Sequence, residues 1–119
     1  MNETQERRHS ITGYSYRKLD IWERSQVLAV RVITIALALP RDPGMAVIVR
    51  QLVGSVGSIG ANIAEGHGRF SRAAYANHLS IAKGSASEVG SWLNLLRRLD
   101  EIAPTSWHPQ LTWRRSART

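Results

Sequence analysis

The sequence contains no cysteine among its 119 residues. This absence excludes disulfides, cysteine-ligated zinc, iron–sulfur clusters and thiol nucleophiles. It also suits the reducing cytoplasm, which is where we expect the protein to act. A chain of this length buries roughly two-thirds of its unfolded surface, so a single hydrophobic core can fold it without crosslinks. The composition, 43% hydrophobic and 21% charged, is typical of one globular domain.

Long uninterrupted apolar runs are missing as well. The most apolar stretch, residues 27–39, contains Arg31 and is followed by Pro40, whereas a bilayer span needs about 20 apolar residues. Arg7 and Arg8 are followed by the sequence H-S-I-T-G, which lacks the apolar core of a signal peptide. We therefore expect a soluble protein with no membrane contact.

Acidic residues are few: nine Asp and Glu stand against 16 Lys and Arg, for a net charge of +7. Much of the surplus lies near the two ends of the chain. Residues 1–18 carry four basic and two acidic side chains, and residues 104–119 carry three arginines and no acid. Such basic tails attract nucleic acid or anionic lipid, but they also keep many domains soluble. Charge alone therefore leaves both interpretations open.

Strand alternation and hairpin signals are absent throughout, which favours an all-α fold. Apolar residues recur at helical spacing in three stretches, each bounded by proline or by a residue that caps helices. These stretches predict helices over residues 19–39, 43–65 and 72–99. We interpret residues 1–17 as a loose N-terminal arm and residues 18–119 as a single helical-bundle domain.

The second predicted helix is unusual for its glycines at positions 54, 57 and 60. Each glycine inside a helix costs about 0.5–1 kcal/mol relative to alanine. Close approach of another helix is the usual compensation, so Gly54, Gly57 and Gly60 predict helix packing within the chain or between chains. Their spacing is not a dinucleotide-binding fingerprint, because no strand precedes them. Gly66 and Gly68 are predicted to end this helix.

The third predicted helix carries two adjacent stripes with the heptad rhythm. One helix of a monomeric bundle needs a single buried arc of a little over 100°, so the second stripe predicts a homo-oligomer. The first stripe comprises Tyr75, Leu79, Ala82, Ala86, Val89, Leu93 and Leu96. The second comprises His78, Ile81, Ser85, Glu88, Trp92, Leu95 and Leu99, of which Ile81, Trp92 and Leu95 are the candidates for packing between chains.

A resemblance to a known family rests on four segments. They are L-D-I-W at residues 19–22, Q-L-V at 51–53, S-I-G-A-N-I-A-E-G-H-G-R at 58–69, and L-S-I-A-K-G-S-A-S-E at 79–88. Together they resemble the four-helix-bundle proteins encoded in intervening sequences of 23S ribosomal RNA genes. The biochemical role of these proteins is not established, so the resemblance implies a fold more than a function.

The resemblance implies an antiparallel up-and-down four-helix bundle, in a family that assembles as a homopentamer. The same superfamily is similar to accessory proteins of diversity-generating retroelements, which bind a reverse transcriptase and nucleic acid. The family has a long amphipathic fourth helix, whereas only residues 103–119 follow Ile102 here. We therefore expect either a shortened fourth helix or a neighbouring subunit in its place, with Trp107, Leu111 and Trp113 packing on the bundle.

Four polar residues lie close to the predicted contact between the second and third helices: Asn62, Glu65, Arg69 and Glu88. They could form an active site with two carboxylates, or a hydrogen-bonded network that fixes the packing of the helices. We favour the structural network and predict no enzymatic activity, because no nucleophile or cofactor motif accompanies them. The predicted helices also lack the Glu-x-x-His pairs of di-iron bundles, so we expect no metal, cofactor or small-molecule substrate.

Basic residues with tryptophans nearby are the candidates for nucleic-acid contact, because single-strand binding combines cations with stacking rings. We therefore predict a non-enzymatic scaffold that contacts RNA or an RNA-bound protein. The alternative is a protein-binding adaptor whose basic tails only aid solubility. The candidate contacts are Arg97, Arg98, Arg114, Arg115 and Arg118, near Trp107 and Trp113.

Overall fold

The computed structural model describes residues 15–102, which form one short 3₁₀ helix and three α-helices. In chain order these are η1 (Tyr16–Lys18), α2 (Asp20–Leu37), α3 (Pro43–His67) and α4 (Arg72–Ile102). The described part of the chain contains no strand, so the all-α prediction is confirmed. The predicted count of four helices is not supported, because three α-helices are found. The predicted short fourth helix falls in residues 103–119, outside the described residues.

Local sequence signals set the start of two helices. The Asp42 side chain accepts a hydrogen bond from the backbone N–H of Met45 at 2.9 Å, and Pro43 occupies the first turn of α3. The Ser71 hydroxyl accepts from the N–H of Ala74 at 3.0 Å at the start of α4. Both caps satisfy backbone donors that have no partner inside the helix. The predicted starts of α3 and α4 are therefore confirmed.

The helix ends differ from the predictions by two or three residues. α2 stops at Leu37 rather than at residue 39, and α4 continues to Ile102 rather than stopping at 99. α3 runs through Gly66 to His67, and Gly68 caps it in a right-handed conformation. Of the two glycines predicted to end this helix, only Gly68 does so. Tyr16 and Arg17, assigned to the loose arm, belong to η1, which packs on α2 and α3.

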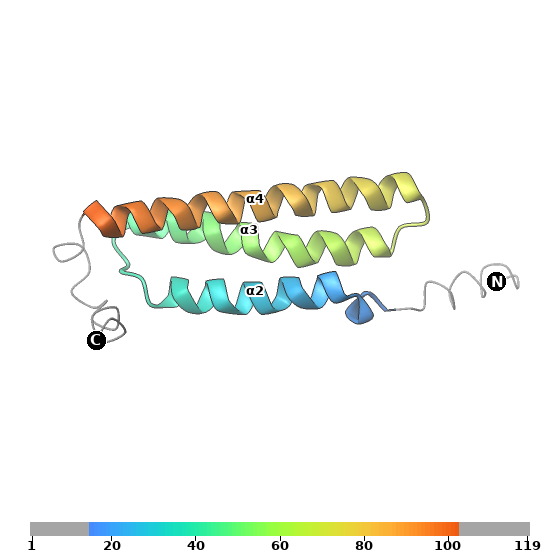
Figure 1. Ribbon diagram of the computed structural model, residues 1–119, viewed down its shortest axis with the longest axis horizontal. Helices are drawn as coiled ribbons and strands as arrows, with labels where there is room; N and C mark the ends of the chain where they lie inside the picture. The colour runs from blue at the N-terminus through green and yellow to red at the C-terminus, as the bar shows by residue number, and fades with distance from the viewer. Residues whose placement is uncertain (1–14, 103–119) are drawn as a thin grey trace, which may run out of the picture.

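α3 is the central helix of the bundle (Figure 1). It packs along both α2 and α4, which scarcely touch each other. The core follows from this arrangement, because α3 contributes most of the buried apolar side chains and its two neighbours cover them. The core residues are Val32 from α2, Met45, Leu52, Val56, Ile59 and Ile63 from α3, and Ala82, Val89 and Leu96 from α4.

The length and mean hydropathy of α3 would also allow it to cross a membrane, which is true of no other helix in the described part of the chain. This is weak evidence for a span, because the core helix of a soluble bundle has the same length and composition. Its central place between α2 and α4 accounts for its apolar character.

Two glycines of α3 allow close approach of its neighbours. A Cβ atom added to Gly60 would lie 2.5 Å from Nε2 of Gln26 and 2.7 Å from Oγ of Ser25, both on α2. One added to Gly66 would lie 2.6 Å from Cβ of His78 on α4. Gly60 thus lies where α3 comes closest to α2, and Gly66 where it comes closest to α4.

Gly54 and Gly57 differ from Gly60 in their surroundings. A Cβ added at either position would meet no atom within 4 Å, and both residues are exposed. No helix in the described part of the chain approaches this side of α3 closely enough to require a glycine there. Packing between chains stays a prediction for these two positions.

We predict that Gly60→Ala and Gly66→Ala each lower the free energy of unfolding by about 1–3 kcal/mol, because the added methyl group has no room. Gly90→Ala is the matched control, since a Cβ added to Gly90 on α4 would meet nothing within 4 Å. Removing that exposed helical glycine should raise the unfolding free energy by about 0.5–1 kcal/mol. Urea denaturation followed by circular dichroism measures all three. Equal effects at the three positions would contradict the packing described for Gly60 and Gly66.

Candidate functional site

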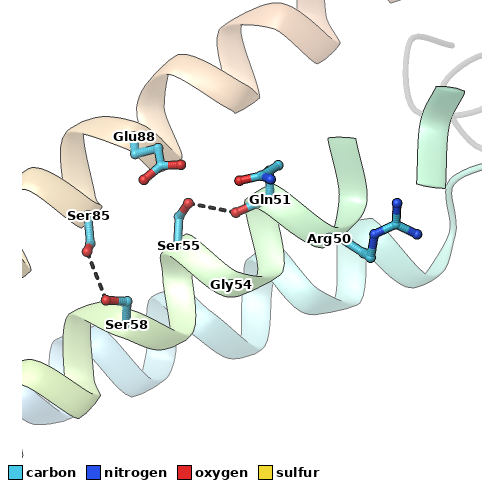
Figure 2. Close-up of a pocket in the computed structure, with 7 residues that line it drawn as sticks. All are labelled: Arg50, Gln51, Gly54, Ser55, Ser58, Ser85 and Glu88. Carbon is cyan, nitrogen blue, oxygen red and sulfur yellow. Dashed lines mark hydrogen bonds between the residues drawn. The ribbon is translucent and has the colours of Figure 1, made fainter. Parts of the chain in front are cut away.

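A line of polar side chains crosses the otherwise apolar contact between α3 and α4. We call Ser58, Asn62, His78 and Ser85 the polar seam. The Ser85 hydroxyl donates to Oγ of Ser58 at 3.0 Å (Figure 2). Nδ2 of Asn62 donates to the backbone carbonyl of Ser58 at 2.8 Å and to its Oγ at 3.0 Å. The seam therefore joins the two helices through short hydrogen bonds.

The His78 ring completes the seam at the other end. Its Nδ1 lies 3.2 Å from Oδ1 of Asn62. Because the Asn62 amide nitrogen already donates to Ser58, Oδ1 is the free acceptor and Nδ1 of His78 must carry the proton. The backbone of Gly66 lies directly beneath this histidine. The missing side chain at Gly66 thus lets His78 come close enough to reach Asn62.

A cavity of about 430 Å³ opens beside the seam, between α3 and α4 (Figure 2). The hydroxyl of Ser55 donates to the backbone carbonyl of Gln51 at 2.6 Å. The Glu88 carboxylate accepts from Nε1 of Trp92 at 3.2 Å. The three serine hydroxyls around the cavity thus bond a backbone carbonyl or one another, which orders the helices but does not activate a nucleophile. The cavity is lined by Arg50, Gln51, Gly54, Ser55, Ser58, Ser85 and Glu88.

The four polar residues predicted to form one network lie in three separate sets of hydrogen bonds. Asn62 belongs to the polar seam. Glu65 and Arg69 form an ion pair of 2.7 Å within α3 and its following turn, with about half of each side chain exposed. Glu88 bonds only Trp92 among the described residues. Of the side chains that join α3 to α4, Asn62 was predicted from the sequence to belong to a polar network, whereas Ser58, His78 and Ser85 were not.

Ser58, His78 and Ser85 have recognisable signals in the sequence. Ser58 belongs to the row of small residues on α3, and His78 and Ser85 belong to the second stripe of α4. Polar residues placed on a helix face that is otherwise buried need hydrogen-bond partners. When two consecutive helices pack antiparallel and each carries polar residues on its buried face, those residues are expected to bond one another. This signal would have predicted the contacts between α3 and α4.

The basic candidates divide between described and undescribed residues. Arg97 donates to Glu101 at 2.9 Å and to Oδ1 of Asn94 at 2.8 Å, while Arg98 is exposed beside it. The acidic Asp100 and Glu101 follow them, so the described end of α4 carries no surplus charge. Arg114, Arg115 and Arg118, like Trp107, Leu111 and Trp113, lie outside the described residues.

Three of the packing candidates lie near Glu88 or on its face of α4. Ile81 and Leu95 on α4 are exposed, on either side of Glu88, and Trp92 is half-buried against the core. Gly54 lines the cavity next to Glu88. We call Gly54, Ile81, Glu88 and Leu95 the outer face of α3 and α4. In residues 15–102, no group of three or more His, Asp or Glu side chains is placed to hold a metal ion.

Comparison with known proteins identifies the family. The profile of the 23S rRNA-intervening sequence protein family matches residues 17–110. The chain belongs to this family. The match covers all three α-helices, the polar seam and the outer face. No curated protein and no solved structure gives a significant match.

We predict that Asn62→Ala lowers the free energy of unfolding by about 1–2 kcal/mol, because it leaves a half-buried His78 donor without its acceptor. Glu65→Gln is the control on the same helix. It alters only a half-exposed ion pair, so its effect should stay within about 0.5 kcal/mol. Chemical denaturation of the two variants beside the native protein makes the comparison. An Asn62 variant as stable as the native protein would show that the seam contributes nothing to folding.

Proposed function

We propose that this protein is a non-enzymatic, homo-oligomeric helical scaffold of the cytoplasm that contacts RNA, or a protein bound to RNA, through repeated basic surfaces. Membership of the family supports a helical bundle but does not itself supply a role. The observation that carries the proposal is the amount of apolar and small-residue surface left open on a strongly basic chain.

The exposed apolar side chains support assembly. On α2, Ile21, Leu28 and Ile35 recur every seven residues and remain exposed in the single chain. On α4, Ile81 and Leu95 of the outer face are also exposed. Apolar side chains repeated along one face of a helix and left exposed are available for contact with another chain.

Gly54 supports the same conclusion by a different route. A glycine inside an exposed stretch of helix costs about 0.5–1 kcal/mol, and no contact in the described chain offsets that cost. A helix of another copy that packs closely on the outer face would use the missing side chain. We therefore place a contact between copies at this face, and propose a pentamer because the family that the sequence resembles assembles in that way.

We predict that the native protein has a solution mass five times that of the 13.3 kDa chain, and that Gly54→Gln dissociates it. The added side chain would fill the space that another copy needs. Gly90→Gln is the control, because it places the same side chain on another open helical glycine away from the outer face. Sedimentation velocity at micromolar concentration measures the masses. A native monomer, or dissociation by both variants alike, would contradict this contact.

The basic charge supports the RNA contact, since arginines near phosphates release condensed counterions. The logarithm of affinity then falls linearly with the logarithm of salt concentration, with a slope set by the number of phosphates engaged. Repetition of each basic surface in an oligomer would raise the overall affinity without any new type of contact.

We predict that the full chain binds RNA with a steep salt dependence, and that replacing Arg114, Arg115 and Arg118 together by glutamine makes the slope shallower. Each phosphate that the variant no longer engages should reduce the slope by about 1. Fluorescence anisotropy across a salt series measures it, with Arg31→Gln on α2 as the control. No binding at low salt would reject the RNA contact and favour the alternative, a protein-binding adaptor.

A further inference from the structure

The turn between α3 and α4 presents an exposed aromatic ring. Phe70 is 84% exposed, more than any other large apolar side chain of the described residues. Hydrogen bonds hold the backbone on both sides of it. The N–H of Arg69 donates to the carbonyl of Gly66 at 3.0 Å, and the N–H of Tyr75 donates to that of Ser71 at 3.0 Å. The ring is therefore displayed by an ordered turn.

Arginines flank this ring on both sides. Arg69 is held by Glu65 at 2.7 Å but keeps about half of its side chain exposed. The Arg72 side chain is exposed and makes no hydrogen bond or ion pair with any residue that the structure describes. The first turn of α4 contains no acidic residue. The turn thus combines one exposed ring with one paired and one unpaired guanidinium group.

The surroundings of the turn add further positive charge. η1, with Arg17 and Lys18, lies at the same end of the bundle (Figure 1). Among residues 15–102, the acids near this end are Asp20, Glu23 and Glu65. Asp20 pairs with Arg24 at 2.8 Å and Glu65 pairs with Arg69, so two of the three are already neutralised. The described end of α4 on the opposite side lacks this surplus, because Asp100 and Glu101 balance the charges of Arg97 and Arg98.

We propose that the α3–α4 turn binds single-stranded RNA, with a base stacked on Phe70 and phosphates contacted by Arg69 and Arg72. The proposal rests on the proposed RNA contact and assigns it to a site that the sequence analysis did not identify. Base stacking on an aromatic side chain and pairing of phosphates with arginine are the two elements of single-strand recognition.

A single ring between guanidinium groups fits an RNA strand better than it fits a bilayer. Phe70 is the only large apolar residue between Gly68 and Arg72, and one side chain offers little apolar area for stable insertion among lipids. One ring is sufficient, however, to stack on one base. A duplex is a poorer fit, because its bases are stacked on each other and are not available to the ring.

The test uses the full chain and two fluorescent RNA probes at one fixed, low salt concentration: a non-self-complementary strand of about 12 nucleotides and a duplex of the same length. Phe70→Leu keeps an apolar side chain but removes the stacking surface. We expect it to bind the single strand about tenfold more weakly and to bind the duplex as the native protein does. Phe70→Tyr, which keeps the ring, should bind both probes like the native protein.

The charge contribution is tested with a matched pair of arginines. Arg72→Gln should weaken binding of both probes at that salt concentration and, when the titration is repeated across a salt series, reduce the salt slope by about 1. Arg31→Gln removes the same charge from an exposed position in the middle of α2 and should leave the turn unaffected. Because Phe70 and Arg72 are exposed, these variants should fold, and circular dichroism checks that they do.

The outcomes separate this proposal from the proposed function. If the native protein binds RNA and Phe70→Leu binds the single strand equally well, the turn is not the site, although the RNA contact stands. If the native protein binds neither probe, the RNA contact fails and this proposal fails with it. If it instead binds phosphatidylserine vesicles, and Phe70→Leu preserves that binding while Phe70→Gln abolishes it, the turn is a membrane contact and the proposal is overturned.

Discussion

The bundle depends on two glycines of α3, because α2 comes close to the helix at one of them and α4 at the other. Gly60 leaves space for Ser25 and Gln26, and Gly66 leaves space for His78. A methyl group at Gly60 would force the side chains of Ser25 and Gln26 to move, and one at Gly66 would collide with Cβ of His78 close to the backbone of α4. Both glycines lie in the second half of α3, so the helices are tightly joined at the end that carries η1 and the α3–α4 turn. The apolar core extends this contact along the remaining length of α3.

The polar seam acts together with the approach at Gly66. Apolar contacts between two long helices tolerate sliding, whereas hydrogen bonds between particular side chains do not. Asn62 on α3 contacts His78 on α4, and Ser58 on α3 contacts Ser85 on α4. From the first pair to the second, the position on α3 moves back by four residues while that on α4 moves forward by seven. This order is the one that antiparallel helices require. The seam therefore fixes the register of α3 and α4, which in turn determines where the outer face and the turn lie.

The sequence predicted the features that depend on local chemistry. Pro40, Asp42 and Ser71 act within their own segments, so the three helices could be placed to within three residues. The sequence could not distinguish Gly54 from Gly60, because both are glycines inside the same helix at the same three-residue spacing. They differ only in their tertiary contacts, since α2 packs against Gly60 and no helix of the described chain packs against Gly54. Nor could the sequence join Asn62 to His78, since their contact depends on the register of two helices. The exposure of Phe70 was missed for a similar reason, because an aromatic residue in a short turn packs inward as readily as outward.

The outer face and the α3–α4 turn, the two proposed contact surfaces, lie at different places on the chain. This separation makes a scaffold physically reasonable. The outer face runs along the middle of α3 and α4, whereas Phe70 and Arg72 lie where those helices meet. Copies joined through the outer face would leave the turn uncovered. A closed ring of such copies would repeat the turn once in every copy, at equivalent positions of a symmetric assembly. One stacked base and one unpaired arginine form a weak contact, but several such contacts on one flexible RNA strand act at high effective concentration. Assembly is thus the step that would turn a weak single contact into useful affinity.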